Sequence, residues 1–586
     1  MRRGTVSPAS KHPARNERLL YALLTIAVTL FAASGRATAQ TGIQSPCQSS
    51  VMGSSFVPMD SWVYPALTRL YSLGYLDTAF LGLRPWTRLS IVHMLEETAP
   101  NLEDAKSSSS NDEAQELYDR LQEELQAGSG GPCRGHAAQL QYESAYTVAR
   151  GISGTPLHDS YHLGETVTND YGRPTEGGFN SYSGGSGYAT AGPFTLYLRG
   201  EFQFAPSATG YSTNLFDALS TQDGVPPATN PVQATIPGLA IGTEVRGRVM
   251  EGYVSAHALG HEISFGKMDE WWGPAQGGAF AYSTNAENIY SFQINRVEPL
   301  WVPGLSHITG KFRYQFLVGS LKGHTRFRDP WVHAEKISFK PTPNVEIGFE
   351  RTVIWGGKGH VPITLHSFLK SFFSFQNVSA AEKFSRGDPG ARFGAFDASY
   401  RLPYLRNWLT FYIDSEAHDD VSPASAPRRA DIRPGLYLSH VPGVPKLDLR
   451  VEGVNTDQST SRSIKGTFTY YETEVPQGYT NNGQIFGDWM GREAKGGQAW
   501  ATWHISANEW IQASWRRQKA AKDFIAGGTT IQDFSAQLVK RFGHDLELNA
   551  IFSHENYLIP IYQSGRQGVN NATVQLTWYP ERRVSF

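Results

Sequence analysis

The chain contains the segment Phe194-Thr195-Leu196-Tyr197-Leu198-Arg199-Gly200-Glu201-Phe202-Gln203-Phe204, in which apolar and polar side chains alternate. In an extended strand successive side chains point to opposite faces, so one face of this segment is apolar and the other is polar. An apolar face suits hydrocarbon and a polar face suits a wet interior, which is typical of a strand in a membrane-spanning β-barrel. Segments of about ten residues with the same alternation recur from Gln139 to Phe586.

These segments predict an all-β transmembrane barrel of about 18 antiparallel strands over residues 136–586. The roughly 450 residues leave about 25 for each strand and its connection, which matches strands joined alternately by short turns and long loops. Such barrels have even strand numbers, so about sixteen is the alternative count. Long loops, which either carry ligand contacts or only cap the lumen, are predicted at 151–192, 207–237, 273–286, 372–389 and 476–495.

The last predicted strand places Ala572, Val574, Leu576 and Trp578 on one face. Pro580 follows it and lacks the N–H that strand pairing needs. The tail 581–586 therefore either overhangs the sheet or pairs at its edge.

The N-terminus carries the features of an export signal. Five basic residues precede the apolar run from Leu19 to Ala33, and small residues follow at Ala37 and Ala39. The run is about fifteen residues long, shorter than the roughly twenty that a membrane-spanning helix needs. We therefore predict a signal peptide over residues 1–39, cleaved near Ala39, and the alternative is a membrane-anchoring helix.

The sequence pattern of residues 40–135 predicts a small helical domain on the periplasmic side of the barrel. Asp60 is placed to cap a first helix and Gly74 is placed to end it. A second helix is expected at 89–97 and a third after Asn111, where leucines recur at helical spacing. Helices this short have little core of their own, so we expect them to pack on one another and on the barrel rim.

The chain has two cysteines, Cys47 and Cys133, and both lie outside the predicted barrel. In an oxidising periplasm an even pair without a metal-ligand spacing favours a disulfide, and two free thiols are the alternative. A disulfide would link the start of the mature chain to the segment just before the first barrel strand.

Composition and motifs exclude several classes of function. The formal net charge is −2, so no strongly basic character favours nucleic-acid binding. Aromatic residues make up 12% of the chain and there are 58 glycines, which suits interfacial aromatic girdles and tight bends. No zincin, Walker or nucleophile-elbow motif occurs, so we expect no enzyme activity, no cofactor and no metal site.

Three parts of the chain are similar to one known family. They read FVPMD at Phe56–Asp60, GKMDEWWGP with YSTNA at Gly266–Pro274 and Tyr282–Ala286, and ERTVIWGG with HVP at Glu350–Gly357 and His360–Pro362. Together they resemble the capsule assembly Wzi family of outer-membrane proteins. The resemblance implies a barrel of about eighteen strands with an N-terminal helical bundle on the periplasmic side. It also implies a lectin that helps to anchor capsular polysaccharide to the cell surface.

The same stretches supply candidate glycan-binding residues. A sugar needs an aromatic surface for its apolar face and polar groups for its hydroxyls. We predict such contacts at Asp269, Glu270, Trp271, Trp272, Asn285, Arg351, Trp355 and His360. The alternative is that the tryptophans anchor the barrel at the membrane interface.

The resulting hypothesis is an outer-membrane, lectin-like protein that binds or anchors capsular or other extracellular polysaccharide. Its expected partners are that polysaccharide, outer-membrane lipid and the barrel-assembly machinery, and it is expected to be a monomer. One alternative is a porin-like or polysaccharide-export channel, which a wide open lumen would favour. Another is a hydrolase with an acid pair such as Asp269 and Glu270, which a carboxylate pair at catalytic distance in a rim cleft would favour.

Overall fold

The computed structural model describes residues 53–104, 109–128, 138–226, 233–375, 378–418, 430–458, 465–580 and 583–585. The chain divides into two units, Met1–Gln48 and Ser49–Phe586, and all described residues belong to the second. The predicted signal peptide and the two cysteines, Cys47 and Cys133, lie outside the described residues. Within the described part of the chain, no helix has both the length and the apolar character needed to cross a membrane.

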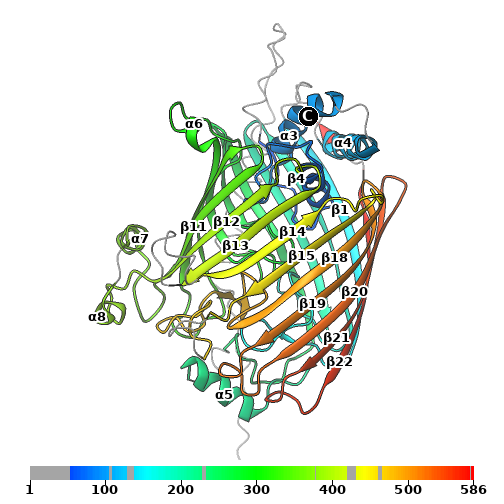
Figure 1. The fold of residues 1–586 in the computed structure, drawn as a ribbon. Helices are drawn as coiled ribbons and strands as arrows, with labels where there is room; N and C mark the ends of the chain where they lie inside the picture. Colours follow the sequence, from blue (N-terminus) through cyan, green and yellow to red (C-terminus); the bar gives the residue numbers. More distant parts are fainter. Residues whose placement is uncertain are drawn as a thin grey trace, which may run out of the picture. The chain divides into compact units, whose positions relative to one another are not determined.

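Within the described residues, eighteen long strands form one closed antiparallel barrel (Figure 1), which confirms the predicted fold class and the count of about eighteen. Closure is made by the first and last of them, which pair from Ala145 opposite Trp578 to Ser153 opposite Asn570. The strands are β1 Ala138–Ser153, β4 Gly178–Ala191, β5 Phe194–Ala205, β6 Glu244–Ala258, β7 His261–Lys267, β8 Tyr290–Arg296, β9 Lys311–Ser320, β10 Trp331–Thr342, β11 Val345–Trp355, β12 Ala391–Arg401, β13 Leu409–His418, β14 Asp431–Leu438, β15 Leu447–Asn455, β18 Ala494–Ser506, β19 Glu509–Ala520, β20 Thr530–Phe542, β21 Leu546–Leu558 and β22 Gln567–Trp578.

A further short strand, β23 (Arg583–Ser585), continues the line of β22 beyond Pro580. It pairs with β1 between Gln139 and Gln141. The described part of the tail, residues 583–585, therefore pairs with β1 and does not overhang the sheet.

The alternation in β5 separates two environments, as its sequence predicts. Phe194 and Phe202 are 60% and 59% exposed on the outside of the barrel, whereas Arg199 and Glu201 are each only 5% exposed. The polar side chains therefore point into the lumen and the apolar ones point outward, which is the arrangement of a barrel surrounded by lipid.

The connections define two different ends of the barrel. At one end the turns are short, such as the two residues between β4 and β5, and we call it the short-turn end. At the other, the long-loop end, connections run to 38 residues between Ala205 and Glu244 and carry three helices, α5 Thr213–Asp223, α7 Leu365–Phe372 and α8 Ala380–Lys383. Figure 1 shows the N-terminal helices at the short-turn end, opposite α5.

The N-terminal helices are α2 Val63–Ser72, α3 Arg88–Asp104 and α4 Ser109–Gly128. All three predicted helices are present, although α3 is longer than the 89–97 expected from the sequence and continues past Pro100. Their apolar faces form one buried cluster, whose fully buried members include Leu67, Leu70, Trp86, Ile91 and Leu121.

The segment that carries α2 enters the lumen and does not stay on the rim. The backbone N–H groups of Leu81 and Gly82 donate to the Glu346 carboxylate of β11 at 2.7 and 2.9 Å. On the far side of the barrel the Arg199 guanidinium of β5 binds the Asp60 carboxylate at 2.5 Å. Because β5 and β11 stand well apart around the barrel, the residues from 53 to 87 occupy the short-turn end of the lumen.

Candidate functional site

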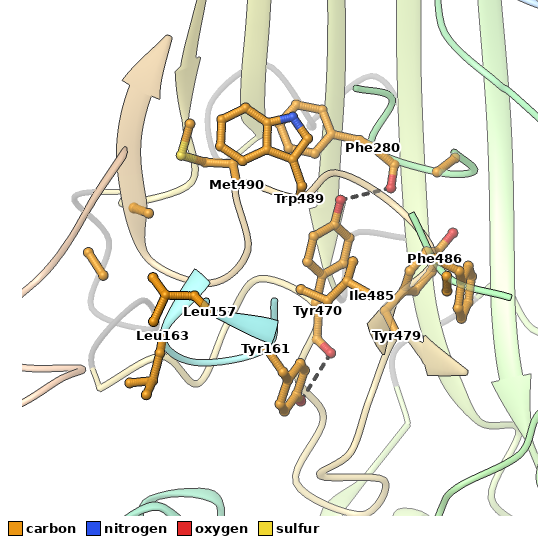
Figure 2. Packing of buried hydrophobic residues seen from close by; sticks show 14 of the residues in the cluster. Leu157, Tyr161, Leu163, Phe280, Tyr470, Tyr479, Ile485, Phe486, Trp489 and Met490 are labelled. Atoms are coloured by element: carbon orange, nitrogen blue, oxygen red, sulfur yellow. Dashed lines mark hydrogen bonds between the residues drawn. The ribbon is translucent and has the colours of Figure 1, made fainter. Parts of the chain in front are cut away.

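Three long loops fold back into the lumen and pack on one another: 154–177, 268–289 and 465–493. Their apolar side chains form one buried cluster (Figure 2), whose labelled members are Leu157, Tyr161, Leu163, Phe280, Tyr470, Tyr479, Ile485, Phe486, Trp489 and Met490. The Tyr470 hydroxyl donates to the Phe280 carbonyl at 2.8 Å, and the Tyr161 hydroxyl donates to the Pro476 carbonyl at 2.5 Å. These bonds join all three loops, so we call them together the loop plug.

The first of these loops is shorter than predicted. The sequence indicated a loop over 151–192, but β4 occupies Gly178–Ala191, so this prediction is wrong for the second half of the segment. The β4 sequence contains four glycines and three serines, which mask the strand pattern. Pairing on both sides, with β1 and β5, supplies the stability that these residues lack by propensity.

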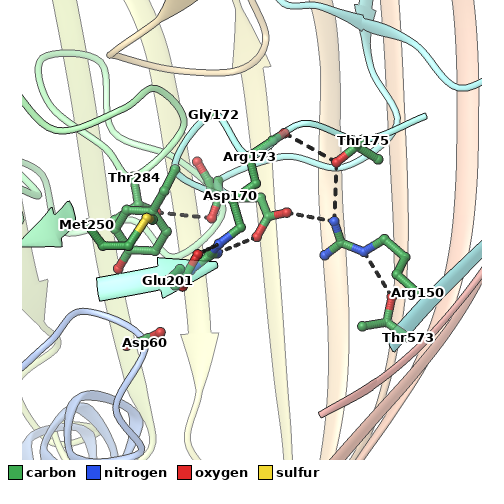
Figure 3. A network of polar contacts seen from close by, with 12 residues as sticks. Asp60, Arg150, Asp170, Gly172, Arg173, Thr175, Glu201, Met250, Thr284 and Thr573 are labelled. Atoms are coloured by element: carbon green, nitrogen blue, oxygen red, sulfur yellow. Dashed lines mark hydrogen bonds and ion pairs between the residues drawn. The ribbon is translucent and has the colours of Figure 1, made fainter. Parts of the chain in front are cut away.

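Buried ion pairs fix the loop plug to the barrel wall. Asp170 in the first loop lies 2.8 Å from the Arg150 guanidinium of β1 and 2.7 Å from that of Arg173 (Figure 3). Arg173 also binds the Glu201 carboxylate of β5 at 2.6 Å. Each charge therefore has a partner, which buried charges require, and the loop is held in one position.

The third loop is fixed by a second ion-pair group. The Arg433 guanidinium of β14 binds Asp488 of the loop at 2.6 Å and Glu452 of β15 at 2.8 Å. All three side chains are fully buried. No sequence pattern marks this group, because its members are 19 to 55 residues apart and meet only after the barrel closes.

His162 links the first loop to the end of α5. Its ring nitrogens lie 3.1 Å from the Asp159 carboxylate and 2.9 Å from that of Asp223, which also binds Arg492 at 2.8 Å. Burial opposes protonation of the ring, but the two carboxylates outweigh it and raise the pKa of His162 to about 9. The loop plug therefore holds a protonated histidine at neutral pH.

We expect the loop plug to loosen as pH rises. The pKa of His162 is raised from 6.5 to about 9 by folding, so its contribution is complete below pH 6.5 and is lost as pH rises through 9. That contribution is up to about 3 kcal/mol. Hydrogen exchange of residues 154–177, corrected for intrinsic rates, should show the opening free energy falling over this range.

The matched variants are His162→Gln and His307→Gln, the second at an exposed position of the short-turn end. Burial raises the pKa of Glu165 to about 8, so ionisation of this carboxyl also destabilises the loop as pH rises. The contribution of His162 to the opening free energy is therefore the difference between the wild type and His162→Gln. If the wild type and His162→Gln had the same pH profile, His162 would not be the titrating group.

The described residues enclose cavities between the N-terminal segment, the loop plug and the wall, and two of them are large. One of about 320 Å³ lies between α2 and loop 268–289, lined by Asp60, Trp62, Arg84, Trp271 and Arg450 among others. The other, of about 540 Å³, lies at the short-turn end, lined by Arg88, Glu143, Glu509 and Arg541 among others. Protein thus occupies the lumen at both ends. Among the described residues, no group of three or more His, Cys, Asp and Glu is placed to hold a metal ion.

Five of the predicted glycan-binding residues lie in the lumen, in loop 268–289. Glu270 accepts hydrogen bonds from Trp272 at 2.9 Å and from Gln293 at 2.6 Å. Trp272 is fully buried. The other three are also buried and bonded to neighbouring protein groups: Asp269 to Met59, Trp271 to Ala275 and Asn285 to Ile485. In this arrangement these side chains hold the loop, and they offer no surface to a polymer in solvent.

Two other predicted residues lie on the outer wall, beneath helix α7. The Arg351 guanidinium donates to the Phe372 carbonyl at 2.8 Å and to the Ser371 carbonyl at 3.0 Å. The Trp355 ring is buried beside His333 and Phe368, with centroid distances of 5.2 and 5.8 Å. The structure thus separates this pair from the lumen group.

His360 lies at the long-loop end and belongs to a group that the sequence did not reveal. The Phe327 ring stacks on it with a centroid distance of 4.2 Å and an interplanar angle of 7°. His360 Nε2 lies 2.9 Å from Asp388, which fixes the ring. The cationic side chains of Arg326, Arg328 and Lys358 come from the same two loops, 321–330 and 356–390. We call Arg326, Phe327, Arg328, Lys358 and His360 the rim platform.

The rim platform combines the groups that sugar recognition needs. Arg328 and Lys358 are exposed. Lys358 forms an ion pair with Asp329 at 2.5 Å, whereas no carboxylate of the described residues forms an ion pair with Arg328. The Arg326 guanidinium lies 3.8 Å from Glu474 in the loop plug, so the platform is joined to the plug. Only His360 carried a signal in the sequence, because Phe327 and Arg328 stand in a short loop without a motif.

Comparisons with known proteins agree with this architecture. A solved structure of Wzi, an outer membrane protein involved in group 1 capsule assembly in Escherichia coli and a carbohydrate-binding β-barrel, has a TM-score of 0.64 to this chain. The two are 16% identical, and the similarity covers 91% of this chain and 100% of that one, so it shows the fold. An uncharacterized 55.8 kDa protein in the cps region of Klebsiella pneumoniae is 24% identical over 164 residues. That match spans 27% of this chain and 31% of the relative.

The family comparison covers most of the barrel. The model of the capsule assembly protein Wzi family matches residues 148–572, from the first strand to the last. This range includes the loop plug and the rim platform. With a match over most of its length and a closed barrel of the same fold, the chain belongs to the capsule assembly protein Wzi family.

Proposed function

We propose that this protein is an outer-membrane lectin that holds capsular or other extracellular polysaccharide at the cell surface. Membership of the family and the described carbohydrate binding of the Escherichia coli protein support this proposal. In this orientation the long-loop end faces outward and the N-terminal helices face the periplasm, as the short turns at that end favour. We further propose a monomer that is inserted by the barrel-assembly machinery and that acts without a cofactor.

The observation that carries the proposal is the buried loop plug. A channel needs a passage lined by solvated groups, whereas here Tyr470, Trp489 and their neighbours pack as a protein core in the lumen. The residues from 53 to 87 occupy the opposite end. The surface left for a partner is the long-loop end, which favours a binding protein over a channel.

We place the glycan contact on the rim platform. Stacking of Phe327 on His360 holds a flat aromatic surface beside exposed cations, which suits the apolar face and the hydroxyl or acidic groups of a sugar. The buried candidates from Asp269 to Asn285, with Arg351 and Trp355, are proposed to act indirectly by holding the loops. Weak contacts are sufficient, because a repeating polymer engages many barrels at once.

Replacing Phe327 by Ala should weaken binding of purified capsular polysaccharide to the detergent-solubilised protein. Loss of one aromatic contact removes about 0.5–1.5 kcal/mol, which is a two- to tenfold weaker affinity. The matched control is Tyr404→Ala, which removes a fully exposed ring (103%) at the short-turn end and should leave binding unchanged. Isothermal titration or surface plasmon resonance with fragments of the polymer provides the measurement.

Three results would contradict the proposal. Equal losses in Phe327→Ala and Tyr404→Ala would move the contact away from the rim platform. A steady conductance of the wild-type protein in planar bilayers would favour the porin-like or export channel. Shortening of the polysaccharide on incubation with the protein would favour the hydrolase.

A further inference from the structure

Helix α7 lies outside the barrel wall, beside β11 (Figure 1). Its start is fixed by a capping box: Ser367 N donates to the Thr364 side chain, and Thr364 N donates to the Ser367 hydroxyl. An eight-residue helix is not stable alone in water, so contacts outside the helix must keep it folded. Its three faces show which contacts these are.

One face of α7 packs on the outer wall. Phe368 and Phe372 contact Phe316 of β9, with ring centroids 6.2 and 6.3 Å apart. The Ser371 hydroxyl lies 2.9 Å from His333 Nε2, and Arg351 binds the carbonyls at the end of the helix. The helix therefore covers polar side chains that point outward from the wall, where exposure to hydrocarbon would be costly.

These contacts place α7 below the end of the strands. Arg351 stands four residues before Trp355, the last residue of β11. At a rise of about 3.3 Å per residue, this position is about 13 Å along the strand from its end. The helix therefore packs on the outer wall below the strand ends, on the side of the apolar band. It does not extend away from the barrel with the loops that surround the rim platform.

A second face of α7 is apolar and uncovered. Leu365 and Phe373 are 72% and 64% exposed, and Leu369 and Phe375 are also exposed. The neighbouring Phe372 packs on Phe316 of the outer wall, and the Phe375 ring lies 5.1 Å from the Arg351 guanidinium, so this apolar face lies beside the lipid-facing side of the barrel. A patch of this kind in water would favour aggregation, so it requires an apolar partner.

A third face of α7 is basic. It carries His366 and Lys370, and the adjacent α8 segment adds Lys383 and Arg386, all at exposed or half-buried positions. Two carboxylates lie against these cations: Glu382 binds Lys370 at 2.9 Å, and Glu472 of the loop plug lies 3.3 Å from Lys383. The residues from 364 to 387 therefore carry a net positive charge beside an apolar surface.

We propose that α7 is an interfacial helix that binds lipid A of the outer leaflet, with acyl chains against the apolar face and phosphates at the basic face. Continuity with the lipid-facing wall and the complementary charge identify this partner. The inference rests on the outward orientation of the long-loop end under the proposed function. Because α7 and His360 belong to one loop, lipid A also sets the height of the rim platform above the membrane.

The test is hydrogen exchange of residues 364–375 in the full chain, held in three media. These are detergent, nanodiscs of phosphatidylcholine, and nanodiscs of phosphatidylcholine with lipid A. We expect exchange at least tenfold slower with lipid A than in detergent, and an intermediate rate in phosphatidylcholine. Leu365→Ser with Leu369→Ser and Phe373→Ser should abolish both gains, whereas Lys370→Ala with Lys383→Ala and Arg386→Ala should abolish only the gain specific to lipid A.

The control carries Trp301→Ser, Leu305→Ser and Ile308→Ser, which remove three exposed apolar side chains at the short-turn end and should change nothing at α7. Equal exchange in all three media would overturn the proposal, and equal protection with and without lipid A would overturn its phosphate part. Protection in detergent that grows with protein concentration would assign the apolar face to a second copy of the chain. Glycan binding in detergent needs no lipid, so the proposed function can fail or hold independently.

Discussion

Replacing Arg433 by Met should release the third loop of the plug from the wall. The change leaves the carboxylates of Asp488 and Glu452 buried without their cation, and breaking a buried ion pair in this way costs about 3–5 kcal/mol. Met is shorter than Arg but keeps an unbranched side chain, so the change removes the guanidinium without adding bulk. Limited proteolysis should cut the segment 465–493 much faster in Arg433→Met than in the wild type, while the strands stay protected.

The matched control is Lys495→Met, which breaks the 2.6 Å contact with Asp457 at a half-exposed position. Exposed pairs contribute about 0–1 kcal/mol, so this variant should be cut at nearly the wild-type rate. Both variants should still migrate differently before and after boiling, which shows a folded barrel. Equal proteolysis of the two variants would mean that Arg433 does not hold the plug.

The second large effect is expected for Trp272→Ala. The Trp272 ring is fully buried, packs on Tyr282 at 4.8 Å and donates to Glu270 at 2.9 Å. Its loss should reduce the free energy of unfolding by about 3–5 kcal/mol, because a large cavity forms and Glu270 loses a donor. Urea unfolding in lipid vesicles measures this loss, and hydrogen exchange of residues 268–289 locates it.

The control for this variant is Trp301→Ala, which removes a half-exposed indole from the turn between β8 and β9 and should cost much less. The comparison also separates a structural role for Trp272 from direct contact with a glycan. If Trp272→Ala abolished polysaccharide binding while loop exchange and stability stayed unchanged, the indole would be a contact residue and our structural assignment would be wrong.

Strand alternation was sufficient to predict the barrel, because a side-chain period of two is visible in most of its strands regardless of their partners. Phe194 to Phe204 shows this directly, since the exposed and buried residues follow the sequence pattern one by one. The strand β4 shows the limit of the method. Its small residues carry little alternation, and only pairing with β1 and β5 makes it a strand.

The positions of the candidate site residues could not be predicted from the sequence, because burial in a lumen depends on which loops fold inward. Trp272 and Trp355 look alike in sequence, yet one lies in the loop plug and the other lies on the outer wall under α7. Phe327 and Arg328 carried no pattern that marks a surface. Their grouping with His360 depends on two loops meeting at one end of the barrel, which a single sequence does not encode locally.

The barrel wall can close only when β22 is present to pair with β1. Among the eighteen long strands, every other pair joins wall strands that follow one another along the chain, whereas this pair joins the first strand to the last, and the short β23 extends the same closure on β1. A chain that ends before β22 therefore keeps two long unpaired edges, at β1 and β21, with free N–H and carbonyl groups. Unpaired strand edges bind other extended chains, so a truncated chain would form an open sheet that is prone to aggregation. Closure of the barrel therefore distinguishes full-length from truncated chains.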